Sequence, residues 1–334
     1  MRRLFPENAI ISENRAVNGE LGYLKLILAF LMVFFAGSLA ASVFTAVAQS
    51  IYVLSDASVV GSLYGEYTDF SELIGKIEEL FADMPVWFTA VTLASNAAVI
   101  FAAVFYCRKF EHRRAFAIGF YRKNAVWEYL AGLFIGVVMF ACVYGIGLLS
   151  GEITFTGVSA DIDFAGIVMI FFGFVIQGAE EEILMRSFVM VSASRCRGGV
   201  PAAIGVNSLI FAALHLMNNG ITPLAFVNLF LFGVFASVYF LRRGSIWGVA
   251  AIHTAWNFVQ GNVFGCPVSG MGSAVSVFGC EKAQGIFTGG AFGPEGGLAV
   301  TFVLIAGILA LLPMKNRLIE VPPFRVKGSF YSIV

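Results

Sequence analysis

Long apolar runs follow one another along most of the chain, separated by short polar segments. A helix needs about 20 predominantly apolar residues to cross the roughly 30 Å hydrocarbon core of a bilayer. The pattern therefore predicts an all-α polytopic membrane protein with about eight transmembrane helices. The expected spans are residues 27–50, 86–106, 129–149, 165–191, 200–217, 223–241, 246–263 and 297–314.

The composition agrees with this fold class. Of the 334 residues, 59% are hydrophobic and 13% are charged, whereas charged residues make up about 25% of a typical soluble domain. No segment has the composition of a separate soluble domain, so residues 1–334 are expected to form a single integral-membrane domain. The formal net charge is +0, and this balance gives no reason to expect nucleic acid as a partner.

The basic residues predict the orientation of the chain, because inner loops of membrane proteins carry an excess of Lys and Arg. With the N-terminus placed inside, 18 of the 21 Lys and Arg residues fall in inner segments. Only Lys76 and Lys282 fall in outer segments, and Arg186 lies within a span. Both termini are therefore expected on the inner side.

Two long outer segments differ in character. Residues 51–85 are acidic, and their apolar positions have helical spacing, which predicts a helix lying at the outer interface. Residues 264–296 are rich in Gly and Ser and are expected to be irregular backbone outside the bilayer. Cys266 and Cys280 share this second segment and are candidates for a disulfide. His112, in an inner loop, is expected to be solvated.

Few polar residues interrupt the predicted spans. An ionisable group inside a bilayer costs about 2.5–3.5 kcal/mol, so such groups tend to be paired and functional. Amides within spans, here Asn207 and Asn228, are expected to form hydrogen bonds between helices. The polar residues singled out within the spans are Glu180, Glu181, Glu182, Arg186, Asn207, His215, Asn228, His253, Asn257 and Gln260.

The loop positions allow several of these groups to meet at one depth. Gly198 lies near the middle of the inner loop between the fourth and fifth spans, 17 residues from both Glu181 and His215. His253 lies 9 residues beyond Gly244 in the next inner turn, about 14 Å along a helix at 1.5 Å per residue. The active site is therefore expected within the helix bundle.

Helical spacing also assigns faces. Glu182 and Arg186 are four residues apart with the acid first, which favours an ion pair. Glu181 lies about 100° around the helix from Glu182 and can point elsewhere. Glu180 is expected at the helix rim or lining a pore.

The same four-residue spacing recurs in two later spans. It places Phe211 beside His215, so the phenyl ring can support the imidazole. It also places His253 beside Asn257, so both side chains can face one target.

Three short motifs together resemble a known family. "EEILMR" at 181–186, "FAALH" at 211–215 and "HTAWN" at 253–257 resemble the motifs of the CAAX protease and bacteriocin-processing family of intramembrane endopeptidases. That family includes the type II CAAX prenyl endopeptidases. The resemblance covers residues 165–265, the catalytic core, and extends weakly to 296 through "FVQGNVFGCPVSG" and "TGGAFGPEGG".

The resemblance implies a function and roles. The chain would be a multi-pass endopeptidase of the bacterial plasma membrane, in contact with membrane lipid, acting on a membrane-associated protein or peptide. Glu181 and His215 would hold and activate water, and His253 and Asn257 would stabilise the oxyanion. The residues that shape the site would be Glu182, Arg186 and Phe211.

Alternatives stay open beside this interpretation. No cofactor is favoured, but Glu181, His215 and His253 could instead ligate zinc or another divalent ion, with water as a further ligand. A proton-coupled transporter would also place acids and histidines within its spans. A non-catalytic immunity or scaffold protein that binds a peptide is the third class.

Overall fold

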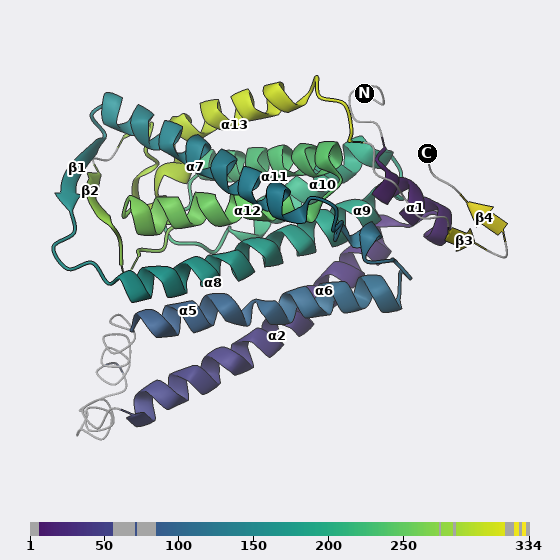
Figure 1. Cartoon of the computed structure of the whole chain (residues 1–334), viewed down its shortest axis with the longest axis horizontal. Coiled ribbons are helices and arrows are strands. Elements are labelled where there is room, and N and C mark those ends of the chain that lie inside the picture. Colours follow the sequence, from purple (N-terminus) through teal and green to yellow (C-terminus); the bar gives the residue numbers. More distant parts are fainter. Residues whose placement is uncertain are drawn as a thin grey trace.

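The computed structural model describes residues 7–55, 71, 85–273, 275–282, 285–317, 324–326 and 329–331. Each of the eight predicted spans coincides with helix, and these helices lie side by side in one bundle (Figure 1). They are α2 (Tyr23–Ser55), α5 (Val86–Ser95) with α6 (Ala97–Lys109), α7 (Ala125–Leu149), α8 (Phe164–Glu182), α10 (Gly199–Leu214), α11 (Pro223–Arg243), α12 (Ile246–Phe258) and α13 (Leu298–Leu311).

Four helical segments in the described part of the chain are long and apolar enough to cross a membrane. They are Tyr23–Ser55, Val86–Lys109, Ala125–Leu149 and Pro223–Arg243, whereas α10 and α13 are apolar but shorter. Leu24, Leu39 and Phe35 of α2 are among many large apolar side chains that point outward, as lipid-facing residues do. The chain is a mostly helical membrane protein with several apolar helices. The count of eight spans and the side on which the termini lie stay predictions.

Helix α12 lies at the centre of the bundle, where every residue from Gly248 to Asn257 is buried. Helix α7 approaches it closely, because a Cβ at Gly132 or Gly136 would overlap backbone carbonyl oxygens of α12. Small residues allow this approach between helices in lipid, where packing rather than the hydrophobic effect holds helices together. The motif "HTAWN" is therefore held on a tightly packed helix.

Two helices change from α to π geometry beside the motifs. Helix α8 continues into the π-helix η2 (Ile183–Met190), whose residues are all buried, and then into α9 (Val191–Ala193). Helix α12 continues into the π-helix η3 (Val259–Val263). Short π segments inside α-helices often occur at functional sites. The four-residue spacing that we used for Glu182 and Arg186 therefore crosses from α-helix into π-helix.

The outer segment 264–296 is more regular than the sequence predicted. It contains strand β2 (Phe278–Lys282), which pairs antiparallel with β1 (Ile153–Val158), and the short 3-10 helices η4 (Gly290–Phe292) and η5 (Pro294–Gly296). The expectation of irregular backbone was wrong for residues 278–282, because their pairing partner lies more than a hundred residues earlier in the chain. The sulfur atoms of Cys266 and Cys280 lie 3.1 Å apart, so the two residues are close enough to interact. The interfacial helix expected in 51–85 falls almost entirely outside the described residues.

A further helix, α1 (Ala9–Asn18), precedes the first span and packs at one end of the bundle near α9 (Figure 1). Ile10 and Ile11 are fully buried, and the Asn14 amide donates to the carbonyl oxygen of Val191 at 3.0 Å. The polar N-terminal segment is therefore part of the folded core. At the same end, His112 is exposed, as expected for a solvated loop residue.

Basic residues of the predicted inner loops are partly buried at this end. Glu111 pairs with both Arg113 and Arg195, and its carboxylate accepts the Ser192 hydroxyl at 3.0 Å. Burial lowers the pKa of Arg195, and the charge of Glu111 opposes that shift. This network joins the loop after α6 to the turn after α9.

Candidate active site

A cavity of about 360 Å³ lies inside the bundle, within the size range of ligand sites. Its lining comes from α2, α5, α8, η2, α10, α11, α12 and α13, and from the outer loop and its short helix η5. All four residues expected to carry the reaction contribute to this lining, as do Glu180 and Phe211. Glu182 and Arg186 lie behind the wall and are 0% exposed. The structure therefore brings the three motifs together around one space.

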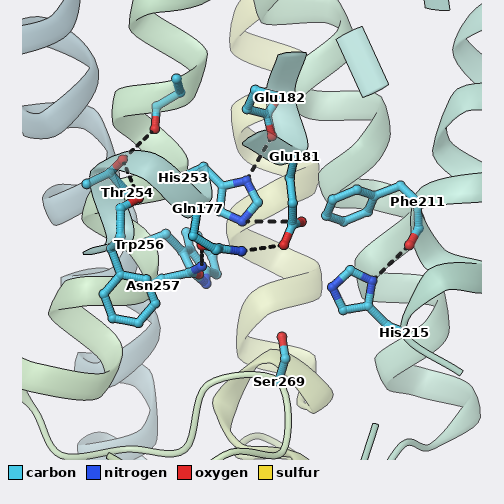
Figure 2. Close-up of polar contacts among 12 residues, drawn as sticks. Gln177, Glu181, Glu182, Phe211, His215, His253, Thr254, Trp256, Asn257 and Ser269 are labelled. Atoms are coloured by element: carbon cyan, nitrogen blue, oxygen red, sulfur yellow. Dashed lines mark hydrogen bonds and ion pairs between the residues drawn. The ribbon is translucent and has the colours of Figure 1, made fainter. Parts of the chain in front are cut away.

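His253 lies between two carboxylates (Figure 2). Its Nδ1 lies 2.8 Å from Oε1 of Glu182, and its Nε2 lies 3.8 Å from Oε2 of Glu181. An ionised carboxylate can only accept, so we assign the Nδ1 proton to the hydrogen bond with Glu182. The other ring nitrogen then faces the cavity beside Glu181.

Glu182 also binds Arg186 as the spacing predicted, with Nη1 at 3.0 Å from Oε1. The Arg186 guanidinium carbon lies 4.8 Å from the ring centroid of Phe211, a cation–π distance. One carboxylate oxygen therefore serves both the arginine and His253. This link makes Glu182 a positioning residue for His253 as well as an ion-pair partner.

His215 is oriented by its own helix. Its Nδ1 lies 2.8 Å from the carbonyl oxygen of Phe211, which can only accept, so the Nδ1 proton is again assigned to this bond. The phenyl ring of Phe211 supports the imidazole, with centroids 4.9 Å apart. Figure 2 shows the other ring nitrogen of His215 turned toward Glu181 across the cavity. That nitrogen offers a lone pair when the ring is neutral.

Gln177 is a site residue that the sequence analysis missed. Its amide donates to Oε1 of Glu181, and its carbonyl oxygen accepts from the amide of Asn257 at 3.0 Å. Asn257 has a second N–H that this bond leaves available. The signal was present, because Gln177 is four residues before Glu181 and so lies on the same helical face.

Glu295 is the second missed residue. It comes from η5 in the outer segment, is 8% exposed and lines the cavity. Its Oε2 accepts from the backbone N–H of Ser269 at 2.7 Å and from the Ser269 hydroxyl at 2.8 Å, and its Oε1 accepts from Trp256 Nε1 at 3.2 Å. The sequence pattern predicted that this residue lies outside the bilayer. It reaches the cavity because the segment 264–296 folds back toward the helix bundle.

The turn that carries Ser269 lines the cavity, and hydrogen bonds hold it from two sides. On one side, Glu295 accepts hydrogen bonds from Ser269 of the turn and from Trp256 of α12. On the other side, Asn218, three residues after His215, donates to the carbonyl oxygen of Ser269 at 3.0 Å. Asn228 of α11 donates to the carbonyl oxygens of Glu295 and Gly297 at 2.8 Å. The turn therefore joins the elements that carry the two imidazoles.

The expected amide contacts between helices are confirmed. Asn207 of α10 donates to the Ser237 hydroxyl of α11 at 2.8 Å. Asn228 accepts a hydrogen bond from Thr301 of α13 at 2.6 Å. Asn228 also lines the cavity, so it supports the site as well as the packing.

The zinc alternative names Glu181, His215 and His253 as ligands. In the described part of the chain, no three His, Cys, Asp or Glu side chains gather closely enough to hold a metal ion. These three residues face one cavity, but in this arrangement they do not form a ligand set. We therefore derive no step through a metal.

Residues 163–259, from the cap of α8 into η3, match the model of the family described as Type II CAAX prenyl endopeptidase Rce1-like. This segment is an Rce1-like domain. It contains all three motifs and Gln177, whereas Ser269 and Glu295 lie beyond the matched residues. A comparison with curated proteins and one with solved structures gave no match.

The Rce1-like domain agrees with the family resemblance of the sequence motifs. The match to this family indicates a protease that works within a membrane. The apolar helices around the domain are consistent with a protein embedded in the bilayer. The cavity that these residues help to line is therefore the candidate active site of a membrane protease.

Proposed function

We propose that the chain is an intramembrane endopeptidase that hydrolyses a peptide bond of a membrane-associated protein or peptide with water activated by Glu181, without a metal ion. The observation that carries the proposal is the position of Glu181, which meets Gln177 and His253 on one side of a buried cavity while His215 faces it from the other. A cavity inside the bundle suits a substrate that is itself in the membrane.

Glu181 is suited to act as the general base. Its Oε1 is held by Gln177, while its Oε2 makes no hydrogen bond with any residue that the structure describes, so one oxygen is fixed and the other can take a proton from water. A carboxylate within hydrogen-bonding reach of the attacking water can take its proton as the water attacks. His215 presents a second acceptor to the same water through its free ring nitrogen.

His253 and Asn257 are suited to stabilise the oxyanion. A peptide carbonyl attacked by water develops negative charge, and donors already aimed at that position lower the barrier. When protonated, His253 can donate from Nε2 while Nδ1 stays bound to Glu182. The second N–H of Asn257 can donate beside it. Glu182, paired with Arg186, keeps His253 in position, and Gln177 holds Asn257. Phe211 orients His215.

Variants of the purified chain in lipid nanodiscs test the roles. Glu181→Gln and His215→Ala should each lower the rate of peptide cleavage at least about 100-fold, as loss of general base catalysis does. Asn257→Ala should cost a similar factor through the lost oxyanion donor. Glu281→Gln, the same change at an exposed carboxylate, is the matched control. Substrates are found by comparing the membrane peptidomes of cells that express the wild-type chain or Glu181→Gln.

Chelation and covalent reagents test the mechanism. Activity should survive treatment with a chelator and with serine- and cysteine-directed reagents, because the proposed mechanism uses neither a metal ion nor a covalent nucleophile. Loss on chelation with stoichiometric recovery in zinc would replace this mechanism with the zinc alternative. A trapped peptide adduct on any side chain would contradict both. Glu181→Gln that leaves the peptidome unchanged would favour a transporter or a scaffold instead.

A further inference from the structure

Glu180 is a buried carboxylate that the proposed mechanism does not use. It is 7% exposed and lines the cavity, and it has no hydrogen bond or ion pair with any residue that the structure describes. Its neighbours Glu181 and Glu182 are both engaged. Removing a carboxylate from water is costly unless a group of opposite charge or a donor compensates for it. Glu180 therefore faces the cavity with its binding capacity unused.

The packing of α8 against α5 defines where Glu180 lies. The two helices run in the same direction, with Gly166 against Val86 and Gly173 against Leu93 (Figure 1). Seven residues make about two helical turns, so the next position on this face of α8 is Glu180, level with Ile100 in the first turn of α6. Glu181, about 100° further around the helix, faces His253 instead. The two adjacent carboxylates therefore serve different parts of the cavity.

This part of the cavity offers acceptors without a cation. Thr92 of α5 and Asn96, between α5 and α6, line the same cavity as Glu180. In the part of the chain that the structure describes, the buried Thr92 hydroxyl has no partner. No Lys or Arg is among the described residues that line the cavity. Phe34 and Leu93 provide apolar surface beside these polar groups. A cavity wall that combines apolar side chains with a carboxylate suits a Lys or Arg side chain, whose stem is apolar and whose head is a cationic donor.

We propose that Glu180, with Asn96 about one turn away on the facing chain, forms a specificity subsite that accepts a Lys or Arg side chain of the substrate close to the scissile bond. The proposal rests on the proposed function for its cleavage readout, but the subsite can be tested by binding alone. A basic residue bound here places the adjoining peptide bond toward Glu181, one position along α8. The subsite thus selects the substrate and aligns it.

The cleavage test uses internally quenched peptides with an apolar core that differ at one scanned position, which holds Lys, Gln or Glu. For the wild-type chain in nanodiscs, kcat/KM should be at least about tenfold higher for Lys than for Gln at one position, as expected for a hydrogen bond to a charged group. Glu180→Gln should bring this ratio close to one, and Glu180→Lys should favour the Glu peptide. Glu180→Asp, which keeps the charge, and Glu281→Gln, at an exposed carboxylate, should retain the preference for Lys.

The binding test separates the subsite from the protease. In the Glu181→Gln chain, the Lys peptide should bind at least about tenfold more tightly than the Gln peptide, and adding Glu180→Gln should remove the difference. This result supports the subsite even if the wild-type chain cleaves no peptide, an outcome that would count against the proposed function alone. Equal affinities of the Lys and Gln peptides for the Glu181→Gln chain would overturn the subsite. A Lys preference that persists in cleavage by Glu180→Gln and in binding to the double variant would also overturn it. Loss of all cleavage in Glu180→Gln with no change in binding would also overturn it and assign Glu180 to the chemistry.

Discussion

Each imidazole at the candidate site is oriented by a hydrogen-bond acceptor that is not itself proposed to take part in the reaction. Glu182 binds Nδ1 of His253, and the carbonyl oxygen of Phe211 binds Nδ1 of His215. In both rings the other nitrogen, Nε2, is left for the cavity. A hydrogen bond at one ring nitrogen sets the tautomer and therefore the chemistry at the other. Residues that only shape the site thus decide what the two histidines can do.

The pair formed by Glu182 and Arg186 makes a prediction about stability. Arg186→Ala should lower the thermal stability and the yield of folded chain, because it leaves a fully buried carboxylate without its cation, a loss of about 3–5 kcal/mol. Glu182→Gln added to Arg186→Ala should restore part of the stability, because it removes the unpaired charge. Thermal unfolding in detergent, followed by size-exclusion chromatography, measures both effects.

Arg197→Ala is the matched control for this experiment, since Arg197 is exposed and its loss should change little. The double variant should stay poorly active even where its stability recovers, because His253 keeps only a neutral partner. Normal stability of Arg186→Ala together with lost activity would instead assign Arg186 a direct part in the reaction.

At the scale of elements, the site depends on a loop that the motifs do not include. The turn around Ser269 is held by Glu295 on one side and by Asn218 on the other. Ser269 has a positive φ of 48°, a conformation that residues other than Gly seldom adopt. The hydrogen bonds to Glu295 help the turn to keep this backbone conformation.

Glu295→Ala should loosen this turn. The substitution leaves the Ser269 N–H and the Trp256 Nε1–H without their acceptor, at a cost of about 1–3 kcal/mol for each unsatisfied donor. Hydrogen exchange at residues 267–271 should therefore become about tenfold faster or more, and peptide cleavage should slow. Mass spectrometry of the chain in nanodiscs measures the exchange. Glu281→Ala, at an exposed position of the same loop, should leave hydrogen exchange and cleavage unchanged. Unaltered exchange in Glu295→Ala would show that Glu295 does not hold the turn.

At the scale of the whole molecule, one end of the bundle gathers the segments that the charge pattern assigns to the inner side. Helix α1, the turn between α9 and α10, and the C-terminal ends of α11 and α13 all lie there (Figure 1). Strands β1 and β2 lie at the opposite end. The arrangement is consistent with alternating spans, while the sidedness itself rests on the distribution of Lys and Arg.

Cysteine labelling tests the sidedness. In a chain whose other cysteines are replaced, Arg197→Cys should react with an impermeant maleimide from the inner side only, and Glu281→Cys from the outer side only, because both positions are exposed. Native Cys196 is the internal comparison and should react much more slowly than Arg197→Cys. It is 4% exposed, and burial raises the pKa of its thiol, so less of the reactive thiolate is present near neutral pH.

Labelling of intact cells or oriented vesicles, with and without detergent, distinguishes the two sides. Reaction of Arg197→Cys from the outer side would reverse the predicted orientation. It would also place the turn around Ser269 on the inner side and change where a substrate meets the site.

Properties set by local sequence could be predicted from the sequence alone. Hydrophobic length located the helices, because crossing a bilayer requires about 20 apolar residues whatever their neighbours. The four-residue spacing gave the contact between Glu182 and Arg186, and the three motifs gave the Rce1-like domain. Gln177 could have been found by the same spacing rule, since it shares a helical face with Glu181.

Only the tertiary structure decided contacts between distant segments. Strand β1 pairs with β2 although more than a hundred residues separate them, and Glu295 reaches the cavity because its loop folds back between α11 and α12. The choice of Glu182 as the partner of His253 likewise depends on how α8 and α12 cross. Such contacts depend on which helices pack together, and the spacing of residues within one helix does not determine its neighbours.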